Sequence, residues 1–236
     1  MAHAILTSDI HRELRVRTER GPELGDAVMT VLVVPDEFRR VQDEYPILFR
    51  LNHERDEFTP VALLGFEAGE NLFLDGNRWD ARYIPLAHDI QPFLIGGTPE
   101  GEGEKQVHVD LASPRIGGGE GMRVFDQDGL PTPYLEGIAE KLGALDAGWR
   151  ATAPFVAALR RYELLEPFTL EVTLDNGATN RLVGYHIIDE ARLAALDAAA
   201  LGDLHAAGHL LPIFMAVAST GRLTALVARR NARLRG

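Results

Sequence analysis

The hydrophobic period of the sequence changes near residue 131, and this change constrains the fold more than any other feature. Before it, short apolar runs such as Val28–Val34 and Val61–Leu64 alternate with turn residues, which predicts buried strands joined by tight turns. After it, apolar residues from Leu135 to Trp149 recur at spacings of three and four, which predicts an amphipathic helix. Strands and helices that come in blocks are typical of an α+β fold rather than of repeated βαβ units.

A β-hairpin is expected inside the helical half. Ala153–Leu165 continues or restarts the helix, and Pro167 is expected to end it. The apolar runs Phe168–Leu174 and Asn180–Ile188 are joined at Asp175-Asn176-Gly177, and Asn-Gly between alternating runs is a strong hairpin signal. We therefore predict one domain over residues 1–236, mostly antiparallel and β-rich to about residue 125, with helices packed against a hairpin from about residue 131.

Local patterns in the N-terminal half predict further elements. His11–Arg17 alternates between apolar and charged residues, which indicates a half-exposed strand. Asp36 is placed to cap a short helix over Glu37–Tyr45. Leu72–Leu74 is expected to form another short buried strand. The Gly/Glu-rich segment Gly96–Gly103 offers backbone freedom and nothing to pack, so it is expected to be a mobile loop.

The charge and the cysteine content argue against several classes of protein. The 236 residues carry a formal net charge of −11, which disfavours general nucleic-acid binding, because neutralising phosphates needs a basic face. Cysteine is absent, so there is no disulfide framework and no thiolate metal site. We see no signal peptide and no run of the ~18 apolar residues that a membrane span requires. We therefore expect a cytoplasmic protein without a transmembrane segment.

The stretch from residue 59 to residue 95 contains the densest mixture of aromatic residues, prolines and glycines. Its aromatic side chains offer large surfaces that serve equally for a core or for a ligand pocket. Two of its polar side chains could orient a ligand among apolar walls, although a turn for the asparagine and a surface ion pair for the arginine are the alternatives. The candidate residues for binding a ligand or a partner are Asn71, Trp79, Arg82, Tyr83 and Phe93.

A weaker alternative is a non-heme iron enzyme. His108 and Asp110 are two residues apart on a predicted strand, so both side chains project to one face, and His186 would complete a set of two histidines and one carboxylate. Such a triplet arises readily by chance, and no arginine is placed for a keto-acid co-substrate. We favour a solvent-facing histidine beside a turn aspartate, and we predict no catalytic residue, no metal and no cofactor.

The C-terminal residues offer a second place for a partner. The apolar run Leu210–Val217 is expected in the core, or together with Ala225–Val227 on a helical partner surface. The final helix carries five arginines and no acidic residue, so its cations complement the helix dipole or dock an acidic partner. His205 and His209 are four residues apart, but Gly208 weakens the helix that they would share, so we expect core or surface histidines.

A series of short segments follows in a recognisable order and at compatible spacing over nearly the whole chain. In the N-terminal half they are Tyr45–Phe49, Pro60–Gly65, Glu70–Phe73, Trp79–Pro85 and Gln91–Phe93. Further along they are Val124–Asp126, Gly129, Pro131–Thr132, Thr152, Leu164–Pro167, Gly184 and Ile188–Glu190. No single segment is specific, but together they resemble the bacterial SapC family.

This resemblance implies an accessory role near outer-membrane uptake or surface systems. Genes of the family are often found near those of flavin-dependent halogenase-like proteins, so a protein partner, in particular a flavoprotein, is implied, and a homo-oligomer is compatible with it. The family supplies no catalytic residue to carry over, so we expect a non-enzymatic binding protein. Its pattern has an acid at the position of Asp110 but no histidine at that of His108, which weakens the iron site. A structural component of a surface layer is the third hypothesis.

Overall fold

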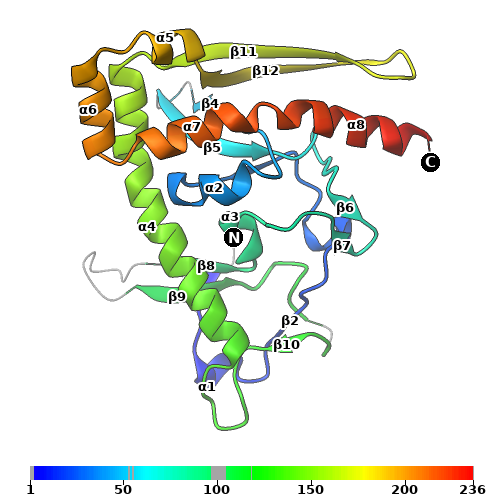
Figure 1. Ribbon diagram of the computed structural model, residues 1–236. Coiled ribbons are helices and arrows are strands. Elements are labelled where there is room, and N and C mark those ends of the chain that lie inside the picture. Colours follow the sequence, from blue (N-terminus) through cyan, green and yellow to red (C-terminus); the bar gives the residue numbers. More distant parts are fainter. Residues whose placement is uncertain (1–2, 53, 55, 97–104, 118, 236) are drawn as a thin grey trace. The chain divides into compact units, whose positions relative to one another are not determined.

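The computed structural model describes residues 3–52, 54, 56–96, 105–117 and 119–235. The chain forms two compact units, each made of segments that are far apart in sequence (Figure 1). Unit 1 comprises residues 1–27, 74–80 and 86–147, and unit 2 comprises residues 28–73, 81–85 and 148–236. The boundary near residue 147 falls inside one long helix, α4 (Pro133–Arg161).

Unit 1 is built from short strands joined by loops. Its three-stranded antiparallel sheet has the order β1-β9-β8, while β10 with β2 and β6 with β7 form two-stranded pairs. The strands are β1 (His3–Ile5), β2 (Arg15–Val16), β6 (Leu74–Asp75), β7 (Arg78–Trp79), β8 (Phe93–Gly96), β9 (Gln106–Asp110) and β10 (Met122–Arg123). The helical elements are α1 (Ser8–His11), η1 (Pro22–Leu24), α3 (Leu86–Asp89) and the first part of α4.

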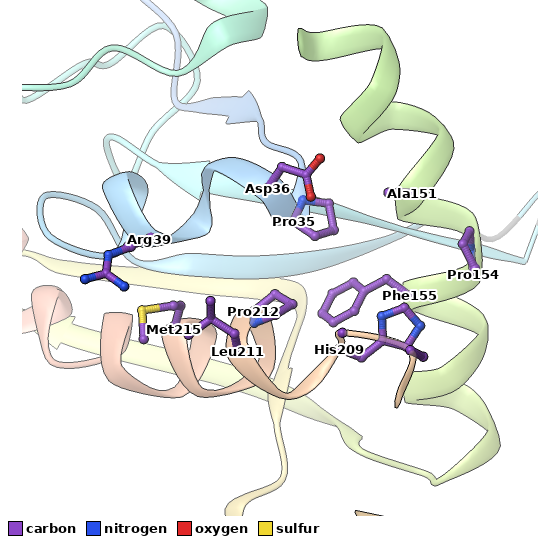
Figure 2. Close-up of a pocket in the computed structure, with 12 residues that line it drawn as sticks. Pro35, Asp36, Arg39, Ala151, Pro154, Phe155, His209, Leu211, Pro212 and Met215 are labelled. Carbon is purple, nitrogen blue, oxygen red and sulfur yellow. The ribbon is translucent and has the colours of Figure 1, made fainter. Parts of the chain in front are cut away.

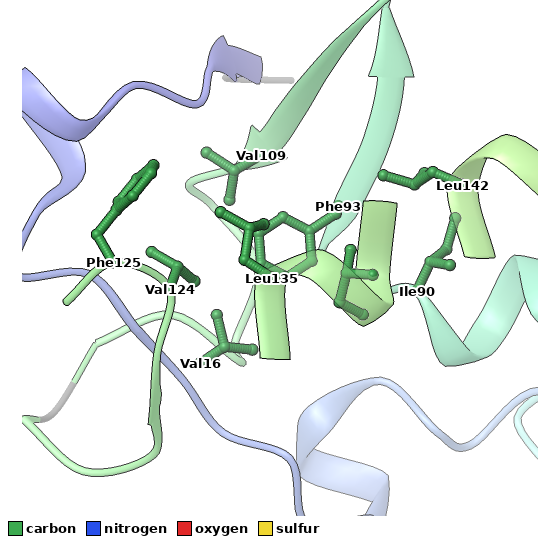
Figure 3. Close-up of a cluster of buried hydrophobic side chains, with 9 residues drawn as sticks. Val16, Ile90, Phe93, Val109, Val124, Phe125, Leu135 and Leu142 are labelled. Atoms are coloured by element: carbon green, nitrogen blue, oxygen red, sulfur yellow. The ribbon is translucent and has the colours of Figure 1, made fainter. Parts of the chain in front are cut away.

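A cluster of buried apolar side chains forms the core of unit 1 (Figure 3). Phe93 on β8 and Val109 on β9 are directly paired across the sheet and both lie in this cluster. The first part of α4 contributes Leu135, Ile138 and Leu142. The other members are Val16, Ile90, Val124 and Phe125. The spacing of three and four along α4 therefore provides the helix face that packs on the strands.

Unit 2 is organised around a five-stranded antiparallel sheet with the order β11-β12-β4-β5-β3. Its strands are β3 (Thr30–Leu32), β4 (Ile47–Asn52), β5 (Glu57–Leu63), β11 (Leu165–Thr173) and β12 (Thr179–Ile188). Its helical elements are η2 (Pro35–Glu37), α2 (Phe38–Val41), the second part of α4, α5 (Glu190–Ala194), α6 (Ala198–Ala206), α7 (Leu210–Ser219) and α8 (Arg222–Arg235).

Aromatic packing joins the helices of unit 2 to its sheet. Phe155 on α4 is 1% exposed, and its ring lies edge-on to that of Phe38 on α2, with 5.9 Å between the centroids. The ring centroid of Phe49 on β4 lies 6.5 Å from that of Phe155. Helix α7 is held to β4 because the Oγ of Ser219 accepts a hydrogen bond from the N–H of Ile47. Burying one such aromatic side chain contributes about 1.5–3 kcal/mol.

The hairpin of β11 and β12 contains a bulge. Phe168 pairs with Tyr185 and Leu170 pairs with Leu182, so one residue of β11 opposes two of β12. One of those two is Gly184, whose φ of 83° lies in the left-handed region that favours glycine. Beyond the bulge, the tip of the hairpin is tied to α8, because Asp175 and Asn231 exchange two hydrogen bonds.

The α+β fold is confirmed, with antiparallel sheets and helices that follow one another at the C-terminus. The hairpin turns at Asp175-Asn176-Gly177, as the Asn-Gly pair predicts. Helix α4 continues through Pro154 to Arg161 rather than restarting. The prediction of one domain over residues 1–236 stays a prediction.

Two predictions about element boundaries are wrong. His11–Arg17 is not one strand, because α1 ends at His11, whose Nδ1 accepts a hydrogen bond from the N–H of Thr7, and only Arg15–Val16 pairs with another strand. Pro167 does not end the helix, since α4 has already ended at Arg161 and the proline lies in β11. This strand is at the edge of its sheet, where proline is tolerated.

Two shorter expectations also need correction. Of Leu72–Leu74 only the last residue is in a strand, because Asn71 closes a turn by accepting a hydrogen bond from the N–H of Phe73. Asp36 does not cap a helix, because it lies inside η2. The carboxylate of the buried Glu37 accepts a hydrogen bond from the N–H of Val34, the residue directly before η2. Except for its first residue, the loop expected over residues 96–103 lies outside the described residues.

Candidate functional site

An apolar cleft in unit 2 is lined by residues of η2 and α2, of the second part of α4, and of the start of α7 (Figure 2). Its volume is about 630 Å³, which is within the range of binding pockets in proteins. Apolar side chains make up most of its lining: Pro35, Pro154, Phe155, Leu211, Pro212 and Met215. A cleft of this kind binds apolar groups by removing them from water.

Two changes of direction in the chain position this lining. Pro35 begins η2 shortly after β3 ends at Leu32, and its fixed φ suits the first position of a helix. Gly208, with a φ of 73°, follows α6, and His209 is the residue directly before α7. His205 remains on α6, so the two histidines do not share one helix, in line with the break expected at the glycine.

Three polar side chains interrupt the apolar lining, and these are Asp36, Arg39 and His209. The first two are exposed, and neither forms an ion pair with any residue that the structure describes. The imidazole of His209 lies edge-on to the ring of Phe155, with 5.5 Å between the centroids, and burial lowers its pKa. The ring is therefore neutral at pH 7 and carries one donor and one acceptor nitrogen.

Helix α7 also presents apolar side chains to solvent. Leu211 and Phe214 are 54% and 50% exposed, whereas Ile213 and Ala216 are 0% and 2% exposed. By length and composition alone, the stretch Leu210–Arg235 could cross a membrane. Several of its apolar residues are used by the core of unit 2, so its hydropathy is weak support for a membrane span.

The predicted binding residues that belong to unit 2 do not line this cleft. Asn71 is 2% exposed, and its side chain closes a turn. The hydroxyl of Tyr83 donates a hydrogen bond of 2.6 Å to the carboxylate of Glu37. The side chain of Arg82 is 89% exposed and lies 3.9 Å from the carboxylate of Glu44. Asn71 and Arg82 therefore have the turn and the ion pair that were the alternatives to a ligand role.

The other two predicted binding residues belong to unit 1. Trp79 is 6% exposed, and its ring centroid lies 5.0 Å from that of His88. Phe93 is 1% exposed and lies in the apolar cluster of Figure 3. The surfaces of both rings are thus used by the core of unit 1. The five residues are divided between the two units, and their role in binding stays a prediction.

The alternative iron site gains no support from the structure. His108 and Asp110 lie on β9 of unit 1, and His186 lies on β12 of unit 2. The ring of His186 packs edge-on against Phe58, with 4.8 Å between the centroids. Among the described residues, no group of three or more histidine, aspartate or glutamate side chains could hold a metal ion.

Unit 1 contains a buried charged network that the sequence does not reveal. The carboxylate of Asp26 is fully buried, and its Oδ1 lies 2.6 Å from both the Nε2 of His88 and an Nη of Arg115. The N–H of Gly21 donates a hydrogen bond of 2.7 Å to its Oδ2. Burial opposes ionisation, but the hydrogen bonds and the charge of Arg115 hold the pKa of Asp26 below its usual value. All three side chains are closed to solvent, which suits a structural role.

The arginines of α8 make contacts inside unit 2. The pairs are Arg222 with Asp43, Arg230 with Glu67 and Glu70, and Arg235 with Asp175, while Arg229 stacks on the ring of Phe73. The ion pairs compensate the charges of Arg222, Arg230 and Arg235 inside the unit. The hypothesis that the tail arginines dock an acidic partner stays a prediction.

The comparison with known families agrees with the order of segments seen in the sequence. The family model SapC matches residues 6–226, which include most of both compact units. No curated protein and no solved structure matches the chain. Because the match covers nearly the full length, the chain belongs to the SapC family.

Proposed function

We propose that this protein is a non-enzymatic binding protein that docks an apolar segment of a partner protein in the cleft between α2, α4 and α7. The observation that carries the proposal is the exposure of Leu211 and Phe214 on the helix that lines the cleft, at 54% and 50%. Large apolar side chains that are exposed beside a concave surface are typical of interaction sites.

The polar groups of the cleft indicate what the partner offers. The guanidinium of Arg39 has no ion pair among the described residues, so it can take a carboxylate of the partner through two parallel hydrogen bonds. An amphipathic helix with apolar side chains at spacings of three and four, and an acidic residue beside them, fits this combination. His209 in its neutral form adds a hydrogen bond without the cost of burying a charge.

The first candidate for the partner is a flavin-dependent halogenase-like protein, which the family resemblance implies, and the proposal places both proteins in the cytoplasm. The polar side chains in the described lining of the cleft are Asp36, Arg39 and His209, and the proposal uses them to orient the bound segment. The iron-enzyme and surface-layer hypotheses have no comparable observation behind them.

Titration calorimetry with the purified halogenase-like protein tests the proposal. Leu211→Asp and Phe214→Asp each place a charge on the apolar face and should weaken binding by about tenfold or more. Val183→Asp is the matched control, because this residue is exposed to the same degree, at 53%, but lies on β12 and not on α7. Far-ultraviolet circular dichroism verifies that all three variants fold. Unchanged binding by both α7 variants, or an equal loss in the control, would contradict the proposal.

A further inference from the structure

A second hollow in unit 2 lies between α4 and the beginning of β5. Its volume is about 400 Å³, and its lining includes Phe58, Trp149, Ala153, Val156, Ala157 and Arg160. None of these residues lines the cleft beside α7. At 3.6 residues per turn, the α4 residues of the hollow fall on the helix face opposite Ala151, Pro154 and Phe155 of the cleft.

The hollow presents aromatic surface to solvent. Trp149 is 51% exposed, whereas Trp79, the other of the two tryptophans, is 6% exposed. Phe58 is partly buried, and its ring is fixed between the guanidinium of Arg160, at 5.8 Å, and the imidazole of His186. Tryptophan and arginine side chains are enriched among the residues that dominate binding energy at interfaces.

The main chain of β5 is open on one side at Phe58. Leu63 donates its N–H to the carbonyl of Pro46, and hydrogen-bonded pairs alternate from there, so Phe58 opposite Leu51 is not bonded to β4. On the other side, the strand register of β3 with β5 ends at Leu32 opposite Val61, and its extension by three residues would reach Pro35 opposite Phe58. Since β3 ends before that proline, which has no N–H, the N–H and C=O of Phe58 have no strand partner.

The rim of the hollow is acidic. The carboxylate of Asp56 is paired with Arg160 at 2.6 Å, but Glu57 is exposed and forms no ion pair with the described residues. A guanidinium suits these surroundings best, because it can form hydrogen bonds with the carboxylate of Glu57 and also stack on the indole ring of Trp149. An extended segment would at the same time satisfy the open main chain of β5.

We propose that this hollow binds an arginine side chain of an extended peptide segment, with the guanidinium between Trp149 and Glu57 and the peptide main chain beside Phe58. This site is separate from the cleft beside α7, so the protein would hold two segments, of one partner or of two. The inference does not depend on the proposed function.

Tryptophan fluorescence of the full-length protein tests this proposal. The probe is an acetylated and amidated Thr-Val-Arg-Val-Thr peptide, and its control carries citrulline, which has nearly the same shape without the charge. The arginine peptide should change the emission, with an affinity about tenfold higher than that of the citrulline peptide. Trp149→Phe should abolish the emission change, since Trp79 is buried.

Charge variants complete the test. Glu57→Gln should reduce the affinity for the arginine peptide by about tenfold, whereas Glu171→Gln, an exposed acid on β11, should leave it unchanged. Leu211→Asp should also leave it unchanged, which separates this site from the cleft beside α7. Equal affinities for the two peptides, the same effect of both glutamine variants, or no response to the peptide at all would overturn the proposal.

Discussion

The two units differ in how they satisfy their buried main chain. Strands of unit 1 are two to five residues long, and Arg115 compensates by donating hydrogen bonds to the carbonyls of Arg17 and Glu19 while it pairs with Asp26. Unit 2 has strands of up to ten residues and an aromatic core. In unit 1 the buried guanidinium of Arg115 therefore bonds main-chain carbonyls that no strand pairs, whereas in unit 2 the longer strands pair with one another.

Removing the charge of Asp26 should have the largest effect on this comparison. Asp26→Asn leaves Arg115 buried without its counter-ion, so unit 1 should lose about 3–5 kcal/mol of unfolding free energy. Hydrogen exchange with mass spectrometry should show that the Asp26→Asn variant exchanges faster than the wild-type protein, and that this increase is larger in unit 1 than in unit 2. Asp75→Asn, in an exposed pair with Arg78, is the control and should cost less than about 1 kcal/mol. Equal effects of the two variants would remove the contrast between the units.

An apolar substitution should act on unit 2 in the same way. Phe38 is 0% exposed, and Phe38→Leu leaves space beside Phe155, which should cost about 1–3 kcal/mol. Phe214→Leu at the half-exposed position on α7 should change stability by less than about 0.5 kcal/mol. Urea unfolding measures both, and a large loss for the α7 variant would show that this residue belongs to the core.

A substitution at the bulge of the hairpin should change stability by a smaller amount, and its control should change stability in the opposite direction. Gly184→Ala places a Cβ at a φ of 83°, which should cost about 1–2 kcal/mol although the site has open space. Gly202→Ala in α6 also meets open space, and it should stabilise unit 2 by about 0.5–1 kcal/mol because alanine favours helix. The midpoint of thermal unfolding should therefore fall for Gly184→Ala and rise for Gly202→Ala. A shift in the same direction for both variants would show that the backbone conformation at the bulge does not cause the loss.

Acid should weaken unit 1 through Asp26. The pKa of this carboxyl is lower in the folded than in the unfolded protein, so its stabilisation is complete above the unfolded value of about 3.9 and is lost as the pH falls through the folded value. The difference in unfolding free energy between the wild-type protein and Asp26→Asn should therefore shrink as the pH falls below about 4. Urea unfolding at several pH values measures it, and a constant difference would disagree with a lowered pKa.

Structural features that depend on a few consecutive residues could be predicted from the sequence. The Asn176-Gly177 turn is an example, because the backbone conformation of such a turn depends on these two residues. The strand expected over His11–Arg17 failed because alternation cannot show that His11 closes a helical turn through its own side chain.

The binding surfaces were only partly predictable. Leu210–Val217 was expected in the core or on a partner surface. It is partly buried and partly exposed, because successive residues of a helix face different directions, and its role in binding a partner stays a prediction. Trp149 has core spacing but is half exposed, since the apolar stripe continues past the residues that cover it. The network of Asp26 joins residues 62 and 89 positions apart, and no local pattern indicates such contacts.

Hydrogen exchange of the full-length protein, alone and bound to the halogenase-like protein, tests the central claim most directly. We expect slower exchange on binding over residues 35–41 and 207–219, which include α2 and α7, with no change in the buried network of unit 1. Protection confined to other segments, or none at saturating partner, would contradict a docking cleft between α2, α4 and α7.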